Sequence, residues 1–217
     1  MIVGIEMMKK ILVLLAGLGL AFSVQSQESP AFELGTHYQK IVPAQTPVGI
    51  SAGKVEVTEF FWYGCPHCYD FEPHLNDWLN KKPKNVIFKR VPAIFNKGWV
   101  IHAKAYYAGE ILGITDKTHP AIFLAIHKDK KALDKAADIA ELMAQASGLE
   151  KQVILDTINS FAVESKSRKA IQAARLHGLR GVPAVAVNGQ FLTSGRQAGD
   201  YPNMTRIMDF LVAKESQ

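Results

Sequence analysis

Residues 54–68 read Lys-Val-Glu-Val-Thr-Glu-Phe-Phe-Trp-Tyr-Gly-Cys-Pro-His-Cys, and this segment says most about the fold of the chain. Its first nine residues are rich in β-branched and aromatic side chains, which predicts a strand over 54–62. The apolar residues that follow have helical spacing and predict a helix over 65–81. Pro66 then falls in the first turn, where its missing N–H has no intrahelical partner to lose. The stretch is therefore a strand that runs directly into a helix.

Cys65 and Cys68 are the only cysteines of this 217-residue chain. A pair two residues apart can cross-link little of the chain, but it can exchange electrons with another dithiol or bind a metal. A zinc site could use both cysteines and His74, yet no second CxxC or closely spaced His pair completes it. Tyr69, rather than His, follows Cys68, which excludes haem attachment. The pair therefore favours redox chemistry.

The N-terminal residues predict export from the cytoplasm. Lys9 and Lys10 precede an uncharged apolar run over 11–22, which ends near small and polar residues suited to a cleavage site. Twelve apolar residues are too few to span a bilayer, which needs about 20. We expect residues 1–26 to be a signal peptide, with an uncleaved anchor or a buried helix as the alternative.

The net charge of the mature chain is mildly positive. The segment over 1–26 carries two lysines and one glutamate, so its loss lowers the net charge from +5 to +4. The remaining lysines are dispersed, which does not indicate nucleic-acid binding.

The rest of the chain predicts one more strand, a run of helices, a hairpin and a last helix. A strand over 85–91 completes a βαβ unit, and a short edge strand is expected near 38–42. Asn188-Gly189 is a hairpin dipeptide between strands over 184–187 and 190–193. Pro73 should kink the first helix. The other expected helices cover 100–112, 120–127, 135–146, 151–161, 163–177 and 202–213.

The predicted order of elements is strand, helix, strand, hairpin and helix, and the CxxC opens the first helix. This order is the thioredoxin-like arrangement. Further motifs are Glu59-Phe60-Phe61, Cys65-Pro66-His67-Cys68-Tyr69 with Phe71-Glu72, Gly181-Val182-Pro183-Ala184 and Val187-Asn188-Gly189. On these motifs the chain resembles the DsbA family of periplasmic thiol:disulfide oxidases. The resemblance covers almost everything after residue 26. It implies an α/β, thioredoxin-like domain over 27–96 and 179–217, with an all-helical domain inserted over 97–178.

Cys65 is expected to be the sulfur that reacts with substrate. A sulfur at a helix start faces unpaired N–H groups and the positive end of the dipole, which together stabilise its thiolate. The dipole supplies roughly 0.3 to 2 kcal/mol, so hydrogen bonds from His67 and Cys68 would have to supply the rest. The ring of His67 should favour the thiolate, with an exposed polar residue without consequence as the alternative. Pro66 is also expected to belong to the catalytic motif, with a role only in starting the helix as its alternative. Cys68, one turn further, should be the more buried cysteine.

Val182 and Pro183 are the expected substrate-binding residues. The resemblance implies a cis peptide bond between them that turns the Val182 backbone toward the sulfurs and leaves an edge for an extended substrate. An ordinary proline at a strand start is the alternative. Alternation along the first strand places Glu59 on a poorly solvated face, although a solvated Glu59 is also open. Lys89 is expected to meet Glu59 as a buried pair beneath the CxxC, and the resemblance implies that both assist proton transfer to or from Cys68.

The resemblance implies a monomeric periplasmic oxidase that donates its disulfide to newly secreted proteins with paired cysteines. It implies no bound cofactor, and reoxidation by a membrane quinone reductase similar to DsbB. A disulfide isomerase or reductase is one alternative, although the segment over 27–53 is too short for the dimerisation domain that known secreted isomerases carry. A non-catalytic peptide-binding chaperone is the other.

The remaining aromatic residues and histidines have no predicted catalytic role. The aromatic residues over 60–63 are expected in the core or along a groove. Four histidines are expected on the surface or on a helix face: His102, His119, His127 and His177.

Overall fold

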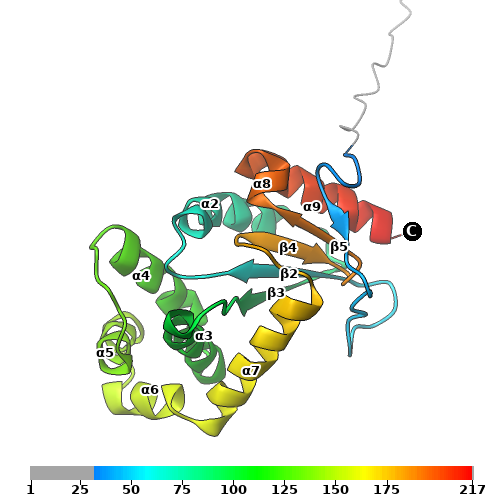
Figure 1. Ribbon diagram of the computed structural model, residues 1–217. Coiled ribbons are helices and arrows are strands. Elements are labelled where there is room, and N and C mark those ends of the chain that lie inside the picture. The colour runs from blue at the N-terminus through cyan, green and yellow to red at the C-terminus, as the bar shows by residue number, and fades with distance from the viewer. Residues whose placement is uncertain (1–31, 217) are drawn as a thin grey trace, which may run out of the picture. The chain divides into compact units, whose positions relative to one another are not determined.

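The computed structural model describes residues 32–216, and the expected signal peptide lies outside them. A five-stranded sheet with strand order β1-β5-β4-β2-β3 forms the centre (Figure 1). Strands β2 and β3 are parallel, as a βαβ unit requires, and the remaining neighbours are antiparallel. The strands are β1 (Gln39–Lys40), β2 (Val55–Phe61), β3 (Val86–Pro92), β4 (Ala184–Val187) and β5 (Phe191–Ser194).

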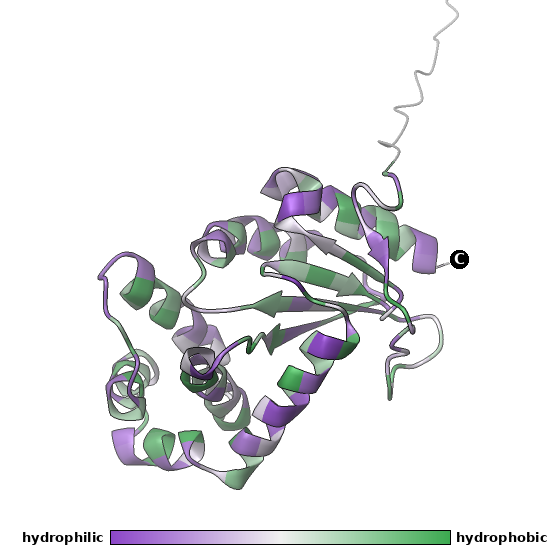
Figure 2. Cartoon of the chain, viewed as in Figure 1, coloured by the Kyte–Doolittle hydropathy of each residue, from purple (hydrophilic) through white to green (hydrophobic). Residues whose placement is uncertain are grey.

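Helices cover both faces of the sheet (Figure 1). Helices α2 (Pro66–Lys81) and α9 (Tyr201–Glu215) pack on one face, where Val57 of β2 shares a hydrophobic cluster with their apolar residues. Phe60 points to the opposite face, where it clusters with residues of β4, and Ala173 of α7 (Phe161–Leu176) packs against this cluster. Figure 2 shows hydrophobic residues along the strands and purple residues along the outer side of α7. Successive side chains of β2 thus point to opposite faces of the sheet, and packed helices bury both faces.

The helices between β3 and β4 form the expected run. They are η1 (Lys97–Trp99), α3 (Val100–Leu112), α4 (Thr115–His127), α5 (Ala136–Ser147), α6 (Lys151–Ile158) and α7. Their largest hydrophobic cluster also contains Phe61, Tyr63, Cys65 and Cys68. The CxxC therefore lies where the helices meet the sheet. Residues 32–216 form one compact unit, and the division into two domains stays a prediction.

The α/β thioredoxin-like fold is confirmed, and most elements lie within a few residues of their predicted bounds. Helix α4 begins five residues before the predicted start at Pro120, so this proline lies inside the helix. Helix α2 likewise runs to Lys81 with Pro73 inside it. The four-residue helix α8 (Gly195–Ala198) was not predicted, and Ser194 caps it by accepting a hydrogen bond from the Gln197 N–H. None of the helices within residues 32–216 is long and apolar enough to cross a bilayer.

Candidate active site

Cys65 caps the N-terminus of α2 with its own sulfur. Its Sγ accepts a hydrogen bond from the backbone N–H of Cys68 at 3.4 Å and lies 3.5 Å from the carbonyl oxygen of Val182, to which the protonated thiol can donate. Both cysteines are free thiols. Cys65 is 8% exposed and Cys68 is 0% exposed, which confirms that Cys68 is the more buried of the two. Cys65 is therefore the sulfur that a substrate can reach.

The two cysteines have opposite tendencies to ionise. A hydrogen bond from the Cys68 thiol, the N–H groups of Cys68 and His67, and the charge of His67 outweigh burial and lower the pKa of Cys65 from 9.0 to about 6. Burial, together with the hydrogen bond to Cys65 and its charge, raises the pKa of Cys68 well above 9.0. At neutral pH the reduced pair therefore consists of a Cys65 thiolate and a protonated Cys68 thiol.

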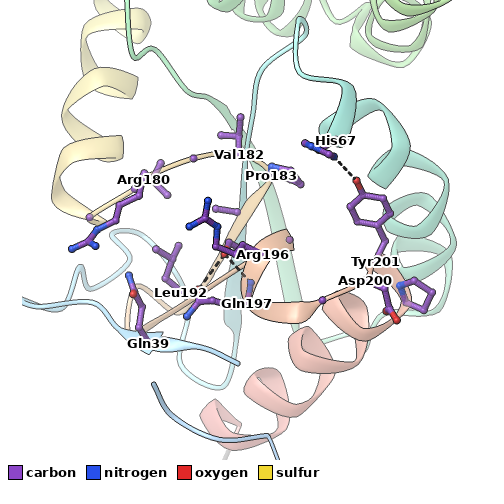
Figure 3. A pocket seen from close by; sticks show the side chains of 18 residues that line it. Gln39, His67, Arg180, Val182, Pro183, Leu192, Arg196, Gln197, Asp200 and Tyr201 are labelled. Atoms are coloured by element: carbon purple, nitrogen blue, oxygen red, sulfur yellow. Dashed lines mark hydrogen bonds between the residues drawn. The ribbon is translucent and has the colours of Figure 1, made fainter. Parts of the chain in front are cut away.

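His67 lies on the exposed side of the helix start. Its Nδ1 is 3.2 Å from the hydroxyl oxygen of Tyr201, the first residue of α9 (Figure 3). This contact joins the CxxC turn to the C-terminal helix, and both residues line one end of the cleft described below. Pro66 occupies the first helical position, as predicted.

The peptide bond between Val182 and Pro183 is cis, as expected. Both residues line a cleft of about 880 Å³ that extends from His67 across the loop before β4 to α8 and the start of α9 (Figure 3). The N–H of Val182 has no backbone hydrogen-bond partner among residues 32–216. An extended peptide beside Cys65 would therefore find a free backbone donor at Val182.

Glu59 is 0% exposed, but its partner is Arg90 rather than Lys89. The Nε of Arg90 donates to the Glu59 carboxylate at 2.8 Å, and its second guanidinium nitrogen contacts Glu72 of α2 at 3.2 Å. Lys89 has a 46% exposed side chain and pairs with Glu56 on the other face of the sheet. The predicted buried pair of Glu59 and Lys89 was therefore wrong.

The register between β2 and β3 explains this error. Glu59 lies opposite Arg90, and Thr58 lies opposite Lys89. Directly opposed residues in a parallel pair share a face, so Lys89 faces away from Glu59. Alternation predicted correctly which residues of one strand share a face, but the match between the two strands was shifted by one residue.

Two of the four histidines expected on the surface or on a helix face are buried beside the active site or near it. His119 is 5% exposed, and its Nε2 donates to Glu72 at 3.2 Å while its Nδ1 accepts from the Tyr63 hydroxyl at 2.9 Å. Burial lowers the pKa of His119 despite Glu72, so the neutral ring bridges these two groups. His102 is 7% exposed and contacts the Leu133 carbonyl oxygen. Sequence reasoning missed Arg90, Glu72 and His119 as members of one network.

The two carboxyl groups beside Arg90, those of Glu59 and Glu72, have pKa values shifted in opposite directions. Burial, with a smaller contribution from Glu72, outweighs Arg90 and raises the pKa of Glu59 from 4.5 to about 8. Burial also opposes ionisation of Glu72, but its bond to His119 and the charge of Arg90 hold its pKa below the usual value. Arg90 therefore faces an ionised Glu72 and a protonated Glu59 at neutral pH. The other oxygen of Glu59, Oε1, has no hydrogen-bond partner among the described residues.

Three side chains of the types that bind metals do not gather anywhere within residues 32–216. His74, the third ligand of the zinc alternative, lies against the ring of Tyr201 with 5.8 Å between ring centroids. Cys65 and Cys68 instead form a polarised thiol pair beside a cis-proline loop. On a thioredoxin-like sheet, this arrangement defines a thiol:disulfide oxidoreductase.

Comparison with known proteins identifies the family. The DSBA-like thioredoxin domain matches residues 99–201. The chain is 41% identical to the thiol:disulfide interchange protein DsbA of Burkholderia cepacia over 206 residues, which cover 94% of this chain and 96% of that protein. DsbA of Azotobacter vinelandii is also 41% identical, over 93% of this chain and 94% of its own length. The chain belongs to the DsbA family and is a thiol:disulfide oxidoreductase.

Solved structures give the same result. The crystal structure of Pseudomonas aeruginosa DsbA matches with a TM-score of 0.79 and 36% identity, over 85% of this chain and 94% of that one. The oxidoreductase DsbA from Xylella fastidiosa matches with a TM-score of 0.78 and 32% identity, over 86% and 98%. The predicted fold and enzyme class are thereby confirmed.

Proposed function

We propose that the oxidised chain donates its Cys65–Cys68 disulfide to newly secreted proteins in the periplasm. The observation that carries this direction of transfer is the opposite shift of the two thiol pKa values. Since the fold stabilises the Cys65 thiolate, it stabilises the reduced form and makes the disulfide an oxidant. Family membership and the sequence of the first 26 residues support a periplasmic location.

Transfer takes two exchange steps. A substrate thiolate attacks the Sγ of Cys65, the Cys65–Cys68 bond breaks, and Cys68 leaves as a thiolate that takes up a proton. A second substrate thiolate then attacks the substrate sulfur of the mixed disulfide, and Cys65 leaves as a thiolate. The substrate loses two electrons and gains a disulfide, and the chain becomes a dithiol.

Mixing the oxidised chain with a reduced peptide that carries two cysteines tests the donation. We expect one intramolecular peptide disulfide for each Cys65–Cys68 pair reduced, which mass spectrometry after acid quenching can count. A chain that leaves the peptide reduced would support the chaperone or reductase alternatives. A chain that reacts only with peptides already holding a wrong disulfide would be an isomerase.

A complete cycle needs an oxidant for the reduced chain. We propose a membrane protein similar to the quinone-linked DsbB proteins, which would accept electrons from the Cys65–Cys68 dithiol through the same cleft. We also propose that the chain works as a monomer without a bound cofactor, since the disulfide itself carries the two electrons. The family relationship supports this assignment.

We further propose that Glu59 supplies the proton that Cys68 takes up. Glu59 is buried, its pKa is raised to about 8, and its free Oε1 leaves one oxygen able to donate. Below pH 8 the carboxyl holds a proton, and above pH 8 it does not. Positioned general acids typically contribute about 10²- to 10⁴-fold. Water can also deliver this proton, so we expect an effect at the lower end of this range or somewhat below it.

Glu59→Gln should therefore slow the reaction of the oxidised chain with a reduced peptide by about tenfold or more at pH 7. The ratio of wild-type to variant rates, measured by rapid quenching between pH 6 and 9, should fall toward one as pH rises through about 8. Glu56→Gln is the matched control, because Glu56 lies on the other face of the same strand and pairs with Lys89. A ratio independent of pH would show that Glu59 is not the proton donor.

A further inference from the structure

Two arginines line the cleft beside Cys65, and no described carboxylate neutralises them. Arg180 lies in the loop before β4 and Arg196 lies in α8, and Figure 3 shows both among the residues that line the cleft with Val182 and Pro183. Both arginines are exposed. Neither forms a salt bridge with any residue in the range 32–216. Their charges are therefore available to a ligand.

The rest of the lining does not offset this charge. Asp200 is the one acidic residue among the described lining residues, and its Oδ1 accepts a hydrogen bond from the Asn203 N–H at 2.6 Å as the N-cap of α9. That carboxylate faces the positive end of its own helix. The other lining residues, His67 apart, are uncharged. The cleft thus carries an excess of positive charge.

Both arginines are close to residues that lie beside Cys65. The Sγ of Cys65 is 3.5 Å from the Val182 carbonyl oxygen, so a substrate cysteine joined to Cys65 passes beside Val182. Arg180 is two residues from Val182. Arg196 follows Gly195, whose N–H donates to the Pro183 carbonyl oxygen at 3.3 Å. An extended peptide rises about 3.3 Å per residue, so side chains two to four residues from its cysteine extend about 7 to 13 Å along the cleft.

We propose that this cleft favours substrate segments that carry Asp or Glu within about four residues of the reacting cysteine. This inference rests on the proposed disulfide donation and adds a substrate class to it. Guanidinium groups bind carboxylates through paired N–H donors, which favours acidic side chains over other polar ones. Solvent-exposed pairs are weak, so two such contacts should change the rate by about two- to tenfold rather than by orders of magnitude.

The test compares three reduced peptides that differ only two residues on either side of the first cysteine, where they carry Glu, Gln or Lys. The second-order rate constant for oxidation by the oxidised chain should fall in the order Glu, Gln, Lys, with about a two- to tenfold span between Glu and Gln at low salt. The span should shrink at about 1 M salt, because screening weakens exposed ion pairs. The Arg180→Gln/Arg196→Gln double variant should bring the ratio of Glu to Gln rates close to one.

Arg168→Gln/Arg206→Gln is the matched control, because it removes two exposed arginines that do not line the cleft. This control should keep the wild-type ratio. Equal rates for the Glu and Gln peptides with the wild-type chain would overturn the inference while leaving disulfide donation intact. A ratio that survives in the cleft variant would also overturn it. Failure of the wild-type chain to oxidise any of the three peptides would instead overturn the proposed donation, and the preference with it.

Discussion

Reduced Cys68→Ser should accumulate a mixed disulfide with a disulfide-bonded peptide, whereas reduced Cys65→Ser should form none in the same time. At pH 7 a thiol with a pKa of about 6 is roughly nine-tenths thiolate, and a thiol with a pKa above 9.0 is about 1% thiolate or less. The lower intrinsic nucleophilicity of an acidic thiol offsets part of this difference. Access decides the outcome, because the Cys68 side chain is 0% exposed.

Serine is the informative replacement for Cys68, because its hydroxyl can still donate a hydrogen bond to the Cys65 sulfur. Without the Cys68 thiol, nothing within the chain can attack the mixed disulfide and release the peptide. Wild-type chain should show the mixed disulfide only transiently, which non-reducing gels after acid quenching can follow. Equal trapping by both variants would contradict the assignment of Cys65 as the reacting sulfur.

Arg90→Met should lower the free energy of unfolding of the oxidised chain by about 3 to 5 kcal/mol at pH 7. The substitution keeps most of the side-chain volume but leaves the Glu72 carboxylate buried without its cation, and breaking a buried pair by removing one partner typically has an effect of about this size. The oxidised form is used because neither cysteine then titrates. Urea unfolding followed by circular dichroism measures the change.

Lys89→Met is the matched control for Arg90→Met. Lys89 is the neighbouring residue on the same strand, but its side chain is 46% exposed and its ion pair with Glu56 should contribute less than about 1 kcal/mol. Equal losses of stability in the two variants would contradict the prediction that Arg90 neutralises a buried carboxylate in the network of Glu59, Arg90 and Glu72. The comparison therefore tests directly the change of partner from Lys89 to Arg90.

The elements that the sequence predicted well are those with a local signal. Pro66 at the first helical position and the apolar spacing after it predict where α2 begins, and so place Cys65 at its N-cap. The Asn188-Gly189 dipeptide predicts the hairpin between β4 and β5. Alternation along β2 predicts that Glu59 is buried. Each of these inferences needs only neighbouring residues.

The missed features depend on contacts between distant elements. The register between β2 and β3 decides whether Glu59 meets Lys89 or Arg90, and alternation within each strand is a weak guide to it where both faces of a sheet are covered. His119 reaches Glu72 across 47 positions. Its location three and four residues before Ile122 and Phe123 does indicate an inward-facing helical position, so its burial could have been predicted although its partners could not.

The lowered pKa of Cys65 stabilises the reduced chain, and it therefore changes the reduction potential by an amount that can be calculated. A folded-state pKa of about 6, against an ordinary 9.0, stabilises the reduced chain above pH 6, and this stabilisation is lost as pH falls through 6. At pH 7 this amounts to about 1.4 kcal/mol, or about 30 mV toward a stronger oxidant. The gain grows until pH 9, where the unperturbed thiol would ionise as well.

Equilibration of the chain with glutathione buffers between pH 5 and 8 measures whether the Cys65–Cys68 disulfide is a strong oxidant. We predict that the Cys65–Cys68 dithiol dominates at pH 7 even where most of the glutathione is oxidised, and that the pH dependence of the equilibrium changes slope near pH 6. Alkylation of Cys65 in the reduced chain should be half-maximal at the same pH. A disulfide that persists in excess reduced glutathione, with a Cys65 thiol that ionises near pH 9, would contradict the assignment of this chain as a disulfide donor.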